Sequence, residues 1–159
     1  MTLLQEIQAK CTPEQIAEGN YHTIAALVSA GRVMNVSTMI TERGVRGALG
    51  PVAGSKFLRL LGDLKTAAAT DVVPGWLSTV LGAMQIPVED HVFYLETLGC
   101  GLDWLKTDGL DLADASVRGL LDIIAGGNPD LVAACASLKA KAERDAPVSW
   151  NECATALGA

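Results

Sequence analysis

Apolar residues recur at helical spacing along most of the chain, and this recurrence limits the fold more than any other feature. In the clearest stretch, one side of a helix carries only apolar residues: Phe57, Leu60, Leu61, Leu64 and Ala68. Basic Lys56 and Arg59 fall on the other side, which is typical of a core helix with a solvated face. Half of all residues are hydrophobic but only 4% are aromatic, a composition that favours tightly packed helices over a β-sandwich.

Caps and breakers divide the apolar pattern into helices. Thr12 with Gln15, and Ser149 with Glu152, have the spacing of capping boxes at helix starts. We expect helices at 2–10, 13–18, 21–30, 51–69, 74–85, 88–106, 115–125, 129–143 and 149–157. In this pattern Met84 faces inward, and Gly99–Gly101 kinks a helix. The length of 159 residues suits one domain. The predicted fold is mainly α, a compact multi-helix bundle forming a single helical domain over 1–159.

One segment does not fit the helical pattern. Residues 32–40, with the sequence RVMNVSTMI, are rich in β-branched residues and lack helical spacing, and several glycines follow them. This pattern predicts one short β strand or an extended arm, the arm spanning 32–50. Because an isolated strand in a monomer has no pairing partner, we expect it to reach a neighbouring copy.

The formal net charge of −6 is unevenly distributed. From Arg32 to Lys65, six basic residues outnumber two acids, whereas from Thr66 to Asp130 ten acids outnumber two basic residues. Two interpretations stay open: solvated helix faces, or complementary surfaces that meet between copies. The second makes these interface candidates: Arg32, Val33, Met34, Val36, Met39, Ile40, Arg43, Arg46, Lys56, Arg59, Asp103, Asp108, Asp111 and Asp114. Nucleic acid is not expected as a partner, because the acidic remainder would repel phosphates.

Two patterns that resemble ligand sites have simpler explanations. Gly50–Lys56 is one residue short of a phosphate loop, and Phe57 stands where that loop needs a hydroxyl. The aspartates between 103 and 114 lack the alternating register of a calcium loop, and Asp114 suits a helix cap.

Cysteine and histidine offer no clear catalytic pair either. His91 and Cys100 lie half a helical turn out of phase, and both histidines are expected at the surface or in caps. The four cysteines are widely spaced without a zinc pattern, and Cys11, Cys135 and Cys153 fall on apolar helix faces. We therefore expect no enzyme activity, no cofactor and no metal.

Three stretches carry a resemblance to a known group of proteins: TLLQEIQAKCTPEQIAEGNYHTIAALVSAGR, then GSKFLRLLGDL with VPGWLSTVLGAMQIP, and finally APVSWNECATALG. Together they resemble uncharacterised small virion-associated proteins of tailed bacteriophages. The resemblance implies a non-enzymatic structural subunit of the virion, of the neck, head–tail connector or capsid-decorating type. Such a subunit would assemble in multiple copies with itself and with other virion proteins.

Two expectations about location and one alternative function accompany this resemblance. Residues 1–10 lack the pattern of a secretory signal and no stretch is apolar enough to span a membrane, so we expect synthesis in the host cytoplasm and no membrane partner. The alternative is an intracellular adaptor or regulator that binds another protein with the same helical fold.

Overall fold

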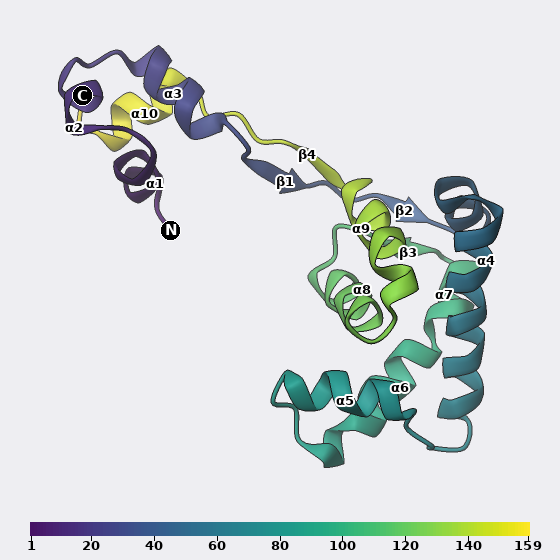
Figure 1. The fold of residues 1–159 in the computed structure, drawn as a ribbon. Coiled ribbons are helices and arrows are strands. Elements are labelled where there is room, and N and C mark those ends of the chain that lie inside the picture. The colour runs from purple at the N-terminus through teal and green to yellow at the C-terminus, as the bar shows by residue number, and fades with distance from the viewer. The chain divides into compact units, whose positions relative to one another are not determined.

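The computed structural model describes residues 1–159 and is mainly α-helical, which confirms the predicted fold class (Figure 1). The contacts divide the chain into two compact units. Unit 1 contains Met1–Met34 and Arg144–Ala159, and unit 2 contains Asn35–Glu143. No shift in composition marks this division, because the chain passes between the units as short strands and not through a linker rich in glycine or proline.

Unit 1 brings the two ends of the chain together. Its helices are α1 (Leu3–Lys10), α2 (Pro13–Ala17), α3 (Tyr21–Ser29) and α10 (Trp150–Ala156). Capping boxes start α1, α2 and α10, and those at Thr12 and Ser149 confirm the sequence prediction. The buried core of this unit is small: Ile7, Cys11, Ile24, Ala25, Val28, Val148 and Cys153.

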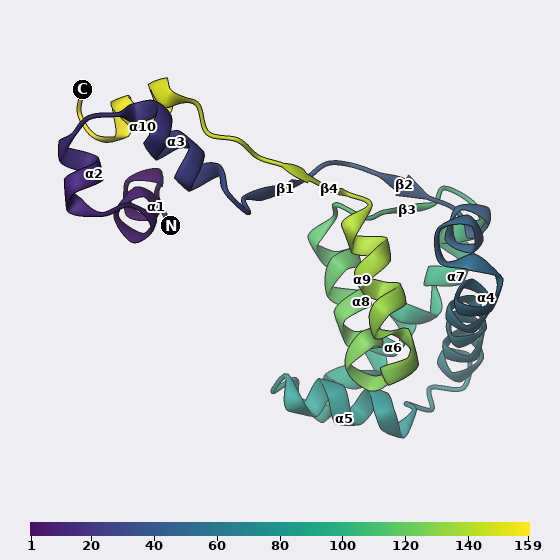
Figure 2. The ribbon, with the colours of Figure 1, turned by 45° about the horizontal axis from the view of Figure 1, so that its top comes forward.

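Unit 2 contains the larger core. Its α-helices are α4 (Glu42–Ala68), α5 (Gly75–Ala83), α6 (His91–Gly99), α7 (Gly101–Lys106), α8 (Ala115–Gly127) and α9 (Val132–Ala140), with 3-10 turns η1 (Val88–Asp90) and η2 (Pro129–Leu131). Helices α6 and α7 run beside α4, and α8 lies against α9 (Figures 1 and 2). The predicted inward stripe of α4 is confirmed, because Phe57, Leu61 and Leu64 are buried in this core.

Helix α4 begins much earlier than the sequence predicted. The expected arm over 32–50 is extended only as far as Ile40, and residues 42–49 are helical. Thr41 caps the helix, its Oγ1 accepting a hydrogen bond from the Gly44 amide at 3.3 Å. Gly50, with φ 80° and ψ 174°, bends α4 just before Pro51. A Cβ on Gly54 would lie only 3.1 Å from the Arg46 Cα, so this glycine permits close packing across the bend.

The predicted break near Gly99 is also present, because α6 ends at Gly99 and α7 begins at Gly101. A Cβ on Gly99 would lie 2.9 Å from the Ala68 Cβ. The absence of a side chain at Gly99 therefore lets α6 approach α4 closely.

Four short strands complete the structure: β1 (Val33–Asn35), β2 (Met39–Ile40), β3 (Leu110–Asp111) and β4 (Glu143–Asp145). Strand β1 pairs with β4, and β2 pairs antiparallel with β3 so that Met39 lies opposite Asp111. None of the helices has both the length and the apolar character needed to cross a bilayer.

Candidate functional site

The extended segment from Arg32 to Ile40 carries all five apolar interface candidates. Val33, Met34 and Met39 are 57%, 50% and 56% exposed, and Val36 is also exposed. Ile40 is the exception, because it is buried in the core of unit 2, where it contacts the helix start at Gly44. Ile40 therefore stays a prediction as an interface residue, and in this structure its side chain is not exposed. The alternation along β2 turns Met39 outward and Ile40 inward.

This segment has strand partners within its own chain, contrary to the expectation that only another copy could pair with it. The Val36 amide donates to the Ala142 carbonyl at 2.8 Å, and the Leu112 amide donates to the Thr38 carbonyl at 3.0 Å. The partner strands β3 and β4 are two and three residues long and contain acids, so sequence reasoning did not recognise them as strands.

Asp111 fastens the extended segment to unit 2. Its carboxylate accepts hydrogen bonds from the Ser37 hydroxyl at 2.7 Å and from the amides of Thr38 and Ala113 at 2.9 and 3.0 Å. The bond from Ser37, followed by those from Ala113 and Thr38, lowers the pKa of the Asp111 carboxyl. The Asp111 carboxylate therefore joins two segments of the same chain.

The other acidic candidates have different surroundings. The Asp114 carboxylate caps α8 by accepting from the Ser116 and Val117 amides, which confirms the predicted cap. Asp103 pairs with Lys65 at 2.6 Å. Asp108 is exposed and makes no hydrogen bond or ion pair in the monomer.

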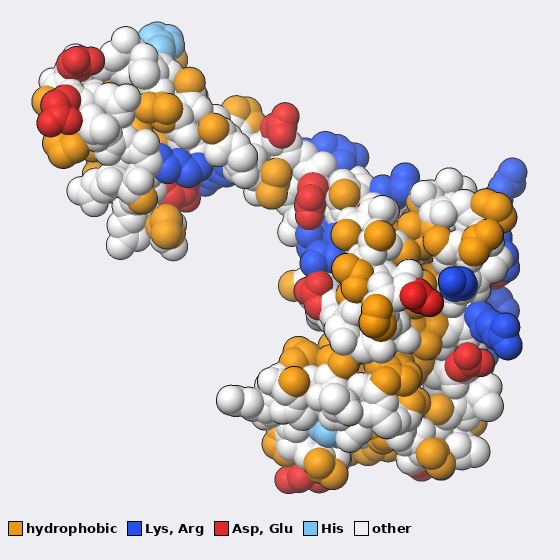
Figure 3. Space-filling view, in the orientation of Figure 1, with side chains coloured by type: hydrophobic (Ala, Val, Ile, Leu, Met, Phe, Trp, Pro, Cys, Tyr) orange, Lys and Arg blue, Asp and Glu red, His pale blue; other side chains and the backbone are white.

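The basic candidates also differ from one another: some form ion pairs within the chain and others do not. Arg46 pairs with Glu42 at 3.3 Å and donates to the Ser55 hydroxyl at 3.0 Å, and Arg32 lies 3.7 Å from Glu6. Lys56 is 3.8 Å from Asp130, and both side chains are well exposed. Arg43 and Arg59 are exposed without an ion pair. Lys and Arg side chains gather over α4 in Figure 3.

Part of the predicted charge matching therefore occurs inside one chain. The Lys65–Asp103 and Lys56–Asp130 pairs each join the basic stretch to the acidic one. Exposed pairs of this kind contribute about 0–1 kcal/mol, so they leave the surrounding surface available to other charges.

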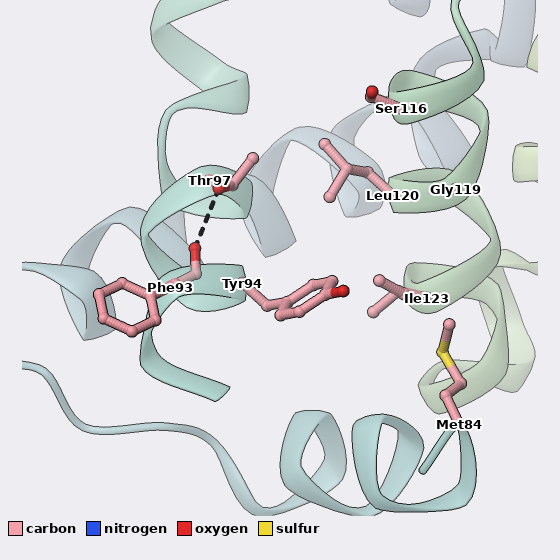
Figure 4. Close-up of a pocket in the computed structure, with 8 residues that line it drawn as sticks. All are labelled: Met84, Phe93, Tyr94, Thr97, Ser116, Gly119, Leu120 and Ile123. Atoms are coloured by element: carbon pink, nitrogen blue, oxygen red, sulfur yellow. Dashed lines mark hydrogen bonds between the residues drawn. The ribbon is translucent and has the colours of Figure 1, made fainter. Parts of the chain in front are cut away.

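A groove between α6 and α8 is the main surface feature that sequence reasoning missed. It has a volume of about 410 Å³ and is lined by Met84, Phe93, Tyr94, Thr97, Ser116, Gly119, Leu120 and Ile123 (Figure 4). Phe93 is 60% exposed and Met84 52% exposed. Met84 was wrongly expected in the core, because it caps the C-terminal end of α5 and lies outside the buried stripe of Leu77 and Leu81. The exposed Phe93 gave no signal of its own in the sequence.

The remaining side chains that could take part in chemistry are the four cysteines and His91. All four cysteines are free, with Cys11, Cys135 and Cys153 buried and Cys100 exposed. Burial raises the pKa of the Cys135 thiol to about 11, which keeps it protonated at neutral pH. His91 is buried, and it stands at the C-cap of η1, which is one of the two positions expected for it. Its Nε2 lies 3.0 Å from the Ile86 carbonyl and its Nδ1 3.2 Å from the Ser78 hydroxyl.

The Ile86 carbonyl can only accept a hydrogen bond, so Nε2 of His91 carries a proton and donates it to this carbonyl. The bond with Ser78 joins the start of α6 to α5, and the bond with Ile86 joins it to the loop that follows α5. No group of three or more histidine, cysteine or acidic side chains is arranged to hold a metal ion.

Comparisons with models of known protein families, with curated proteins and with solved structures find no match to this chain.

Proposed function

We propose that this chain is a non-enzymatic structural subunit of a tailed-phage virion, of the neck, head–tail connector or capsid-decorating type, present in multiple copies. It would be made in the host cytoplasm and bind copies of itself and other virion proteins. The observation that carries the proposal is the run of exposed apolar side chains at Val33, Met34, Val36 and Met39. The resemblance of the sequence to virion-associated proteins supplies the biological setting.

Exposed apolar side chains on neighbouring positions are typical of surfaces that become covered by a partner. Fully burying a side chain such as Met or Val stabilises a complex by about 1.5–3 kcal/mol. Two half-exposed methionines, Met34 and Met39, would therefore contribute about 2 kcal/mol when covered, which corresponds to about a thirtyfold change in affinity.

Light scattering and electron microscopy of the purified protein, alone and mixed with capsid or tail components, test this proposal. We expect oligomers or decorated particles with the wild-type chain and about thirtyfold weaker association for Met34→Lys/Met39→Lys. The matched control is Val72→Lys, which changes another well-exposed apolar residue outside the segment. A strict monomer that binds no virion component would overturn the proposal.

A second candidate is an intracellular adaptor or regulator, and the groove between α6 and α8 favours it. Its apolar lining could receive a helix from another protein. Capture from infected and uninfected cells, with wild-type protein and Phe93→Ser in parallel, separates the two functions. A non-virion protein recovered with wild type and lost with Phe93→Ser supports the adaptor.

A further inference from the structure

The extended segment 33–39 has one edge that its own chain leaves unpaired. The Arg32 carbonyl and the Val36 amide bond to the residues that flank β4, and the Thr38 carbonyl accepts from the Leu112 amide beside β3. Amide and carbonyl groups alternate between the two edges of an extended chain, so the even-numbered residues face β4 and β3. The other edge carries the amides and carbonyls of four exposed residues: Val33, Asn35, Ser37 and Met39. We call these four residues the free edge.

Strand β1 lacks the features that usually protect the edge of a sheet. Edge strands commonly carry charged side chains or proline, which discourage pairing with another chain. Strand β4, at the other edge of the ribbon, consists of Glu143, Arg144 and Asp145 and so has this protection. Strand β1 has no charge and no proline, and all its residues are exposed. Because a two-stranded ribbon is only marginally stable in water, a further strand added to β1 would stabilise it.

The order of residues along the free edge matches itself when reversed. Apolar Val33 and Met39 lie three positions on either side of Val36, and polar Asn35 and Ser37 lie one position on either side. In an antiparallel pair centred on Val36, apolar residues lie opposite apolar ones and polar residues opposite polar ones. A register shifted by two residues instead sets Val33 against Ser37. Matched cross-strand pairs stabilise a sheet, so the sequence of the edge favours a second copy of itself as the partner.

We propose that the free edge of one copy pairs antiparallel with the free edge of a second copy, across a two-fold axis at Val36. Odd-numbered residues then lie opposite odd-numbered residues, so every amide of the free edge donates to a carbonyl of the other copy. The contact uses the same surface of both copies and therefore closes as a dimer. This inference rests on the proposed multi-copy function and names both the partner and the geometry of the exposed apolar segment.

A cysteine at the two-fold axis tests the register directly. The two copies of residue 36 form a non-hydrogen-bonded pair with Cα atoms about 4.5 Å apart, within the range of a disulfide. The background is Cys100→Ser, which removes the exposed native thiol. With oxidised glutathione, Val36→Cys should form a linked dimer on a non-reducing gel. Two protein thiols become one disulfide, and oxidised glutathione is reduced to two thiols.

Matched cysteine variants away from the axis are the control. The two copies of residue 33 lie six residues apart along the paired strands, about 20 Å, so Val33→Cys alone should not link, and the same holds for Met39→Cys. An equal mixture of these two variants should link, because residue 33 of one copy lies opposite residue 39 of the other. A mixture that links no faster than either variant alone would overturn this register.

A proline at position 35 tests the backbone pairing without removing an apolar side chain. The Asn35 amide lies on the free edge, so Asn35→Pro removes a bond to the second copy and none to β4. Because each copy loses one such bond, dimerisation measured by analytical ultracentrifugation should weaken by about thirtyfold. The matched control is Asp145→Pro, which removes an outward amide from the opposite edge of the ribbon and should dimerise like wild type. Circular dichroism checks that both variants fold.

The outcomes separate this contact from the proposed function. Linkage through residue 36, together with weaker dimerisation of Asn35→Pro, supports the two-fold pairing. No linkage through residue 36 overturns the pairing, and the structural role stands when the wild-type chain still binds virion components. A wild-type chain that stays monomeric and binds no virion component overturns both. Loss of another virion protein from Asn35→Pro, without linkage through residue 36, assigns the free edge to that protein and overturns self-pairing.

Discussion

Replacing Arg118 with methionine should destabilise unit 2 strongly, although no sequence pattern singles out this residue. Its Nη2 donates to Glu143 Oε1 at 2.6 Å, and its Nη1 donates to the carbonyls of Leu112 and Lys139 at 3.2 and 3.1 Å. The Arg118 side chain is only 16% exposed. One guanidinium therefore joins α8 to the end of α9, the start of β4 and the turn after β3.

The expected loss follows from these three bonds. Arg118→Met keeps most of the side-chain volume but removes one donor from each of three acceptors, the Glu143 carboxylate and the carbonyls of Leu112 and Lys139. Hydrogen bonds to charged groups contribute about 1.5–3 kcal/mol each, and water reaches Glu143, which is 35% exposed. We therefore expect a loss of about 2–3 kcal/mol in the free energy of unfolding, or about 10 °C in the melting temperature of unit 2.

Urea unfolding followed by tryptophan fluorescence measures this change. Trp150 belongs to unit 1 while Trp76 and Trp104 belong to unit 2, so a Trp150→Phe background restricts the signal to unit 2. Arg43→Met is the matched control, an exposed arginine without an ion pair, and should change stability by no more than about 0.5 kcal/mol. An Arg118→Met variant as stable as this control would contradict the stabilising role given to the Arg118 hydrogen bonds.

Three further predictions concern packing, thiol reactivity and pH. Gly99→Ala should cost about 1–3 kcal/mol because its Cβ would meet Ala68, whereas Gly82→Ala, with open space around position 82, should be neutral or slightly stabilising in thermal unfolding. Alkylation with iodoacetamide followed by mass spectrometry should modify Cys100 in the native protein and the three buried cysteines only after unfolding; rapid native labelling of Cys135 would contradict its raised pKa. The lowered pKa of Asp111 means that its stabilising effect is present above pH 3.8, the ordinary value, and is lost as the pH falls from there through the folded value. Acid unfolding of Asp111→Asn should lack this part of the wild-type pH dependence.

Local signals made much of the fold predictable. The caps at Thr12, Ser149 and Asp114 each depend on residues within three positions, and all three form as expected. The inward stripe of α4 was also readable, because helical spacing alone places Phe57, Leu61 and Leu64 together.

The wrong predictions come from packing that helical spacing and capping residues do not report. Glycines at 44 and 54 suggested an extended arm, yet they permit close packing at Ile40 and Arg46 within a helical region. The division into two units was hidden because each unit's core is decided by tertiary packing. The groove between α6 and α8 depends on these two helices lying together, and its exposed Phe93 could not be placed before that packing was known.

The most direct measurement of the central claim is the copy number of this chain in purified phage particles, obtained by mass spectrometry against an isotope-labelled standard. A structural subunit should be present in several copies per particle and remain after particles are washed at high salt. A chain that is absent from particles, or that is present in fewer than one copy on average, would contradict the proposed structural role.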